Sequence, residues 1–250
     1  MSPAPLWPIA RATLLEAWRG RLLWLWLALL GVVAAVAVFV AELTVSESDR
    51  FLVTWLAVGL RLAAVMIIAF FVAGSVLRER DEQRLQFVIA LTNSRLQFIL
   101  GKLCGAFLIA LLFALTAGIA LRIAGGAGTA WGVSLLFELM LVAALTLFAA
   151  GAFRSVAPTL ALVLFAYLLA RAWPGLAYLS RASVFLNDNP LLVDAADLFA
   201  LVLPRLDLFT RTAWLFDAEP NVLLLVILQA TLYTAILILA AAIDFRRHDL

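Results

Sequence analysis

The chain is poor in the residues that build disulfides, metal centres and many catalytic sites. It has one cysteine, Cys104, and one histidine, His248, among its 250 residues. A disulfide framework, a zinc site or an iron–sulfur cluster within one chain is therefore excluded. Charge is also scarce, because 14% of the residues are charged and the formal net charge is +2, whereas about a quarter of the residues are charged in soluble domains. This balance does not indicate nucleic-acid binding.

Sequence motifs for catalysis are missing as well. The sequence contains no serine nucleophile elbow, no phosphate-binding loop and no helical pair of metal-binding histidines. The glycine-rich segment 125–128 follows no predicted strand and lacks the lysine of a phosphate loop, so we interpret it as a turn. We therefore expect no enzyme activity and no bound cofactor in this chain. If its function needs ATP, another chain must hydrolyse it.

Apolar sequence is what the chain has in excess. Hydrophobic residues make up 66% of it, and the mean hydropathy is +1.10. A helix needs about 20 mostly apolar residues to cross about 30 Å of hydrocarbon. Six stretches meet this requirement: 22–41, 52–76, 103–124, 133–152, 157–179 and 222–243. The sequence predicts an all-α integral membrane protein with six transmembrane helices in a single domain, residues 1–250.

The basic residues indicate how these spans are oriented, because they concentrate in cytoplasmic loops. Arginines and a lysine gather before the first span, between the second and third, between the fourth and fifth, and after the sixth. By contrast, the connection 42–51 is net negative and 125–132 carries no charge. We expect both termini to be cytoplasmic and residues 180–221 to be external. The first span is too long for the core of a signal peptide, so we expect it to be retained.

Residues 7–20 form an amphipathic pattern ahead of the first span. Trp7, Leu14 and Trp18 share one side, and charged residues occupy the other. Arg11 falls on the apolar side, from where its long side chain can reach the polar boundary. The pattern predicts an N-terminal interfacial helix.

The external segment 180–221 is predicted to contain two short amphipathic helices before the last span. Asn189 is a favourable N-cap and Pro190 a favourable first helical residue. A second stretch, 205–216, carries an Asp207–Arg211 pair at helical spacing. We expect both helices on the outer leaflet, where they could meet a periplasmic partner.

The segment 78–103 carries a pattern of its own, RERDEQRLQFVIALTNSRLQFILGKL. It resembles the segment after the second span in type-2 ABC exporter permeases. There, R-E-R-E-E-G-T-L-E precedes an apolar helix, then L-P-x-S-R, then G-K-L at the start of the third span. Gln83, Arg84 and Thr92 depart from this pattern. The matching residues are Arg78, Glu79, Arg80, Asp81, Glu82, Leu85, Leu91, Ser94, Arg95, Gly101, Lys102 and Leu103.

The resemblance extends to both ends of the chain. Glu16 and Arg19 are similar to the E-x-x-R ending of the family's N-terminal helix, and the final segment 245–250 is similar to its F-x-R-R-D-L tail. The resemblance implies a cytoplasmic coupling helix that docks on an ABC ATPase subunit, and this subunit would bind ATP and Mg²⁺. It also implies a second permease copy or a paralogue, surrounded by lipids of a bacterial inner membrane. The expected ATPase contacts are Glu79, Arg80, Asp81, Glu82, Leu85, Val88, Leu91, Ser94 and Arg95.

Charged residues inside the predicted spans are a second candidate site. Arg61 and Glu138 lie well within the second and fourth spans, where ionisable groups are costly and are often functional. They form either a structural ion pair or part of a cargo pathway. Arg122 and Arg171 lie nearer the ends of their spans, so we expect them to reach the outer membrane boundary.

Two other functions stay open on the sequence. An intramembrane enzyme, such as a protease or acyltransferase, would need paired carboxylates with histidine or a Ser–Lys pair, which Glu138 by itself does not supply. An assembly or anchoring protein would need no transport chemistry. The favoured hypothesis is the transmembrane permease subunit of an ABC transporter, moving a cargo that the sequence does not identify.

Overall fold

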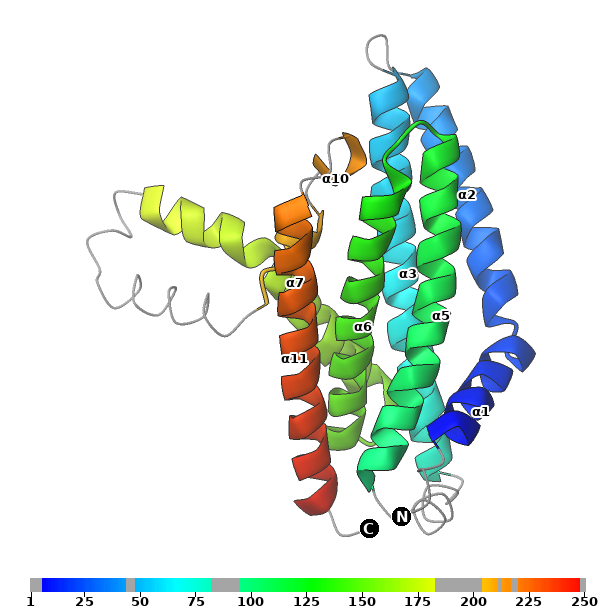
Figure 1. Cartoon of the computed structure of the whole chain (residues 1–250), viewed down its shortest axis with the longest axis vertical. Helices are drawn as coiled ribbons and strands as arrows, with labels where there is room; N and C mark the ends of the chain where they lie inside the picture. Colours follow the sequence, from blue (N-terminus) through cyan, green and yellow to red (C-terminus); the bar gives the residue numbers. More distant parts are fainter. Residues whose placement is uncertain are drawn as a thin grey trace.

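The computed structural model describes residues 6–43, 48–81, 95–182, 204–210, 213–216 and 220–247. Within these residues the regular elements are helices (Figure 1). The helices are α1 (Leu6–Arg19), α2 (Leu22–Glu42), α3 (Ser48–Asp81), α5 (Arg95–Ile123), α6 (Gly128–Ala152), α7 (Val156–Ala182), η1 (Leu208–Thr210), α10 (Ala213–Phe216) and α11 (Pro220–Arg247).

Six of these helices, α2, α3, α5, α6, α7 and α11, are long and apolar enough to cross a membrane. The six predicted spans are therefore confirmed, and the chain is a multi-pass membrane protein. Helix α3 extends further than predicted: its 34 residues rise about 51 Å, against about 30 Å of hydrocarbon. Its charged last turn lies against α1, α5 and α6 at one end of the bundle.

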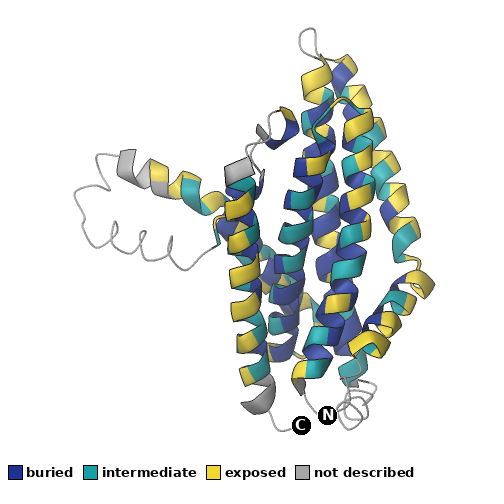
Figure 2. Ribbon diagram, in the orientation of Figure 1, coloured by how far each residue is buried: buried dark blue, intermediate teal, exposed yellow. Residues whose placement is uncertain are grey.

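The bundle has an inner and an outer set of helices (Figure 2). Most of the apolar length of α3 and α6 is buried, whereas α2 and α11 are largely exposed, as expected for surfaces that face lipid. Helices α5 and α6 pack closely because glycines face each other: a Cβ at Gly118 would lie 2.8 Å from the carbonyl oxygen of Gly128. Between them, Gly125 has φ +89°, a conformation that favours glycine.

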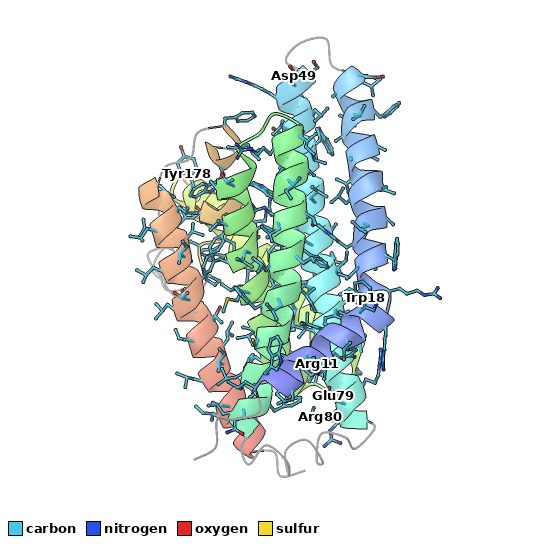
Figure 3. All side chains as sticks on the ribbon, turned by 45° about the vertical axis from the view of Figure 1, so that its right-hand side comes forward. Arg11, Trp18, Asp49, Glu79, Arg80 and Tyr178 are labelled. Atoms are coloured by element: carbon cyan, nitrogen blue, oxygen red, sulfur yellow. The ribbon has the colours of Figure 1, made fainter. Side chains whose placement is uncertain are left out.

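The start of α5 and the end of α11 meet at one end of the bundle. Phe98 and Ile99, near the start of α5, cluster with Ala241 near the end of α11, and α3 ends close by (Figure 1). We call this the Arg80 end. Asp49 lies at the opposite end (Figure 3), which we call the Gly125 end. Helices α1 and α11 share an end, as an even number of spans requires; which end faces the cytoplasm stays a prediction.

Helix α1 covers the Arg80 end of α3 and α5. The buried side of α1 carries Ala10, Thr13 and Ala17. This side packs closely against α5, since a Cβ added at Gly105 would lie only 2.7 Å from the Cβ of Thr13. Trp18 is exposed on a neighbouring side (Figure 3). The helix predicted for residues 7–20 is therefore present, while its place at a membrane interface stays a prediction.

The direction of the chain changes sharply between α1 and α2. Arg21 adopts the left-handed conformation, with φ 57°, which lets α2 turn away from α1. Helix α2 is then fixed to α5 by Trp26, whose ring stacks on Phe113 at 4.4 Å between centroids. The indole Nε1 of Trp26 also donates a hydrogen bond to Thr116 Oγ1 at 2.8 Å.

The predicted amphipathic helix at 205–216 is wrong in its described part. A turn, the 3-10 helix η1 and the short helix α10 replace it. The carbonyls of Leu208 and Phe209 accept hydrogen bonds from Trp214 Nε1 and Ser134 Oγ at 2.8 and 2.7 Å, so side chains occupy acceptors that a continuous helix would use. Phe209 and Trp214 are buried against the bundle rather than spread on a leaflet. The other predicted external helix, 190–203, lies outside the described residues.

Candidate functional site

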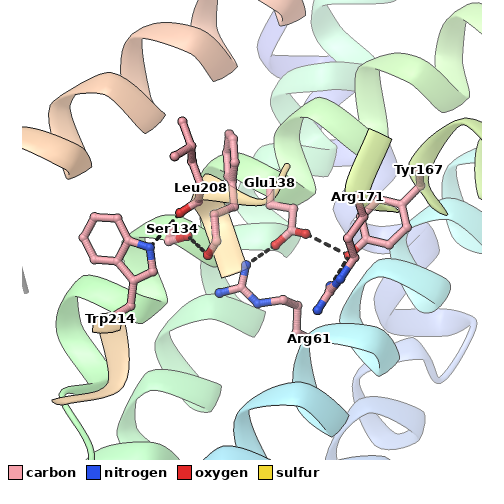
Figure 4. A network of polar contacts seen from close by, with 8 residues as sticks. Arg61, Ser134, Glu138, Tyr167, Arg171, Leu208 and Trp214 are labelled. Carbon is pink, nitrogen blue, oxygen red and sulfur yellow. Dashed lines mark hydrogen bonds and ion pairs between the residues drawn. The ribbon is translucent and has the colours of Figure 1, made fainter. Parts of the chain in front are cut away.

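The first charged site lies in the interior of the bundle (Figure 4). Arg61 of α3 and Glu138 of α6 form an ion pair between Nη1 and Oε2. Their side chains are 3% and 0% exposed, respectively. Both charges lie in the interior because α3 and α6 are the two most buried of the six candidate spans. The pair that the sequence suggested is thus a direct contact.

Helix α7 completes this site. Tyr167 donates its hydroxyl to Glu138 Oε1 at 2.8 Å, so both carboxylate oxygens have a partner. Arg171, one helical turn further along α7, donates to the Tyr167 hydroxyl at 3.1 Å. On the other side, the guanidinium of Arg61 lies 4.9 Å from the ring centroid of Trp131. We call these five residues the Arg61 network.

The Arg61 network balances most of its buried charge locally. Glu138 offsets Arg61, and the face of Trp131 is a further favourable partner for a cation. Arg61 Nη2 is the exception, since it is buried without a hydrogen-bond partner among the described residues. Because a buried charge is costly without a partner, this arrangement holds α3, α6 and α7 in one register. It fits a structural ion pair better than an open pathway.

A second charged cluster lies at the Arg80 end, with Lys102 of α5 at its centre. The Lys102 side chain is 4% exposed, and its Nζ lies 2.7 Å from Glu79 Oε1 of α3 and 3.5 Å from Glu16 Oε2 of α1. Lys102 also donates to Ser75 Oγ at 2.6 Å, and that hydroxyl donates to Glu16. Arg78 is more distant, with Nη1 3.9 Å from Glu16 Oε1. We call these five residues the Lys102 cluster.

Arg80 connects the same end of α3 to α6. Its guanidinium donates to the carbonyl oxygens of Ala150, Gly151 and Phe153 at 3.2 to 3.3 Å. The last carbonyls of a helix lack partners within that helix and carry partial negative charge. Helix α6 has no basic residue in its own last turn, so Arg80 supplies the cation from a neighbouring helix.

The residues predicted to contact an ATPase fall into three groups. Glu79 and Arg80 contact α5 and α6 of their own chain (Figure 3). Asp81 and Arg95 are the last residue of α3 and the first of α5. The remaining residues lie outside the described part of the chain: Glu82, Leu85, Val88, Leu91 and Ser94.

Several members of the two sites were not singled out as site residues in the sequence. Lys102 and Glu16 entered as parts of a family pattern, and Tyr167 sits unmarked in an apolar run. Arg171 was expected at the outer boundary, but it is partly buried and bonded to Tyr167. A signal was available for Tyr167, because Tyr167 and Arg171 are four residues apart and share one side of a helix.

Metal chemistry finds no support in the described residues, which contain no group of three or more His, Cys, Asp or Glu side chains that could hold an ion. Comparison with known proteins adds no assignment. No family model matches the chain, and a search of curated proteins finds no match. The sequence pattern of residues 78–103 and the two charged sites are therefore the features that bear on function.

Proposed function

We propose that this chain is the membrane-spanning permease subunit of an ABC transporter, driven by a separate ATPase subunit. The class of transporter comes from the resemblance of residues 78–103 to type-2 exporter permeases. Under this proposal the Arg80 end faces the cytoplasm, and the segment 82–94 docks on the ATPase. A second copy of the chain, or a paralogue, completes the conduit.

One structural observation supports the proposal best: charged contacts fasten the helix that leads into this segment to its neighbours. Glu79 bonds to Lys102 of α5, and Arg80 bonds to the carbonyl end of α6. Glu16 brings α1 into the same cluster. A displacement applied to the segment would therefore act on α1, α3, α5 and α6 together rather than be lost in a loose connection.

The same helix links this end to the membrane interior. Helix α3 carries Glu79 and Arg80 at its end and Arg61 within the bundle, where Arg61 pairs with α6. Motion that begins at the ATPase would reach the centre of the bundle through one continuous helix. A rigid connector of this kind is what conversion of ATP binding into movement of membrane helices requires.

The Lys102 cluster also decides which residue should be changed to test docking. Replacing Glu79 with arginine would set two cations beside each other at a largely buried site, so the bundle itself would be disturbed. Leu85 and Val88 are better targets, because the resemblance places them on the apolar side of the docking helix. Leu85→Asp should leave the protein in the membrane and release the ATPase.

The experiment is purification of the tagged chain from its own host, followed by mass spectrometry of partner chains and measurement of Mg²⁺-dependent ATP hydrolysis. We expect the wild type to retain a chain with a phosphate-binding loop, and Leu85→Asp to lose it. Arg122→Gln, at the Gly125 end, is the control and should keep the partner. The proposal fails if the wild type carries no ATPase, or if Leu85→Asp keeps both the partner and its activity.

A further variant separates docking from transmission. Glu16→Gln removes the charge by which α1 joins Lys102, but it leaves the Lys102–Glu79 pair and the predicted docking residues unchanged. We expect this variant to bind the ATPase while losing the ATP-dependent change in tryptophan fluorescence that the wild-type complex should show. An unchanged fluorescence response would mean that the Lys102 cluster does not transmit motion.

A further inference from the structure

A groove of about 420 Å³ opens between α1, α2 and α3 at the Arg80 end. Its walls are apolar and its rim is charged. The walls are formed by Leu22, Leu25, Met66, Ile67, Phe70 and Phe71. The rim carries Glu16, Ser75 and Arg78. The rim residues also belong to the Lys102 cluster, whereas the apolar walls have no role in the proposed transport.

Two glycines of α3 explain why the groove lies where it does. At Gly59 helices α2 and α3 touch, since a Cβ there would lie 2.6 Å from Val33 Cγ1. At Gly74 the same Cβ would meet nothing within 4 Å. The helices therefore contact each other deep in the bundle and leave space toward the Arg80 end. Gly20, in the turn between α1 and α2, lines the same space.

The depth of the groove corresponds to one leaflet of a membrane. From Met66 to Arg78, α3 advances twelve residues, or about 18 Å at 1.5 Å per residue. Half of a hydrocarbon core is about 15 Å. A molecule with a headgroup at Arg78 and a chain reaching Met66 would thus have the length of one lipid tail.

The charge of the rim selects the headgroup. Arg78 is exposed over 66% of its side chain, and its ion-pair partner among the described residues is Glu16, at 3.9 Å. That distance is too long for a hydrogen bond, so the guanidinium keeps donors for a phosphate. Lys102 lies between Glu16 and Glu79, so these three residues and Arg78 together carry no net charge. The excess positive charge at this end comes from Arg19 and Arg21, which are exposed on either side of Gly20.

The width of the groove fits an acyl chain better than a helix from a second copy. A helix about 10 Å wide and 18 Å long has a volume of about 1,400 Å³, so it would lie across the opening of a groove of about 420 Å³ rather than within it. A flexible acyl chain needs far less width. We propose that the groove binds one anionic phospholipid, with its phosphate at Arg78 and an acyl chain between α2 and α3.

The test uses the purified chain without any ATPase, so it stands apart from the transport proposal. Native mass spectrometry from detergent micelles would follow titration with phosphatidylglycerol and, separately, with phosphatidylcholine of the same chain length. Both lipids carry a phosphate, but the choline cation of phosphatidylcholine would lie beside Arg78, Arg19 and Arg21, so the wild type should bind one phosphatidylglycerol at least about tenfold more tightly. Equal binding of the two lipids would overturn the charge argument.

Two variants with matched controls locate the site. Gly74→Leu fills the groove, whereas Gly31→Leu adds the same side chain to an exposed site on α2 where a Cβ also meets nothing within 4 Å. Gly74→Leu should lose the bound lipid, and Gly31→Leu should keep it. Arg78→Gln should remove the preference for the anionic lipid, and Arg154→Gln, an exposed arginine of the α6–α7 connection, should not.

Folding controls and competition by free phosphate complete the test of lipid binding in the groove. Circular dichroism and size-exclusion chromatography would show that each variant is folded, and Arg78→Gln tests the site without adding bulk. Loss of lipid in both glycine variants, or in neither, would mean that the lipid binds elsewhere on the surface. Inorganic phosphate that displaces the lipid completely would indicate a free-anion site and overturn the proposal.

Discussion

The ion pair between Arg61 and Glu138 allows a quantitative prediction. Glu138→Gln removes one buried charge and leaves the other: Arg61 would remain 3% exposed without a counter-charge. Breaking a buried pair in this way costs about 3–5 kcal/mol. The ring of Trp131, 4.9 Å from the guanidinium, contacts Arg61 both before and after the substitution, so it does not reduce this cost. We therefore expect Glu138→Gln to destabilise the protein by about 3–5 kcal/mol.

The double variant is the informative member of the set. Changing Arg61 to glutamine as well removes the orphaned charge, and two amides can still bond to each other and to Tyr167. The double variant should be more stable than the sum of the two single effects predicts, by at least about 2 kcal/mol. Unfolding by a denaturing detergent in mixed micelles, followed by the fluorescence of the eight tryptophans, measures each free energy.

A second cycle provides the control. Arg205 and Asp207 form an ion pair at 3.4 Å whose arginine is exposed, and pairs of that kind contribute about 0–1 kcal/mol. The same double change there should show little coupling. If the effects at Arg61 and Glu138 simply add, or if their coupling does not exceed that of the exposed pair, the two residues do not stabilise the bundle as a pair.

Three further predictions concern other parts of the chain. With Cys104 replaced, a cysteine at Ser183 should react with an impermeant reagent in sealed cells and one at Ser94 should not; the opposite result would reverse the predicted orientation. Gly128→Ala should destabilise the bundle by about 1–3 kcal/mol, because its Cβ would overlap a backbone carbonyl of α5; unchanged unfolding in mixed micelles would contradict this close packing. Trp26→Phe should cost about 1 kcal/mol in the same assay, since it loses one hydrogen bond to α5 but keeps the ring; a loss above about 3 kcal/mol would mean that the indole does more than bond and stack.

The six spans could be predicted because hydropathy reports directly on transfer into lipid, and each span must satisfy its backbone within itself. What the apolar pattern could not show is where each helix stops. Helix α3 continues to Asp81 because its last charged residues gain partners on α1, α5 and α6. Hydropathy alone placed the end of that span at residue 76.

The partners within the charged sites were beyond a single sequence for a related reason. Which residues meet depends on how the helices cross, and the Arg61–Glu138 contact joins positions 77 residues apart. The sequence could mark Arg61 and Glu138, because charge in an apolar run is conspicuous. Tyr167 is not conspicuous there, and Lys102 looked like part of a loop until helix α5 was seen to begin at Arg95.

The helix predicted just before α11 was wrong for the same reason: the partners of its residues could not be read from the sequence. Residues 205–216 have helical spacing, so an amphipathic helix was the natural prediction. Ser134 of α6 instead donates to the carbonyl of Phe209, and Trp214 donates to that of Leu208, six residues before it. One tertiary contact and one contact within the segment thus replace helical backbone bonds. Local periodicity could not reveal partners that lie on another helix or beyond the turn.

The distance in sequence between Arg61 and Glu138 has a consequence for how the protein is made. Helix α3 leaves the ribosome before α6, and the partner charge follows 77 residues later. At about 5–20 residues per second, that delay is roughly 4–15 s. A lone arginine within a span costs about 2.5–3.5 kcal/mol on insertion, so the apolar residues of α3 must favour insertion enough to offset it. Arg61 stays without its counter-charge until α6 enters the membrane, and assembly is completed when Glu138 pairs with it.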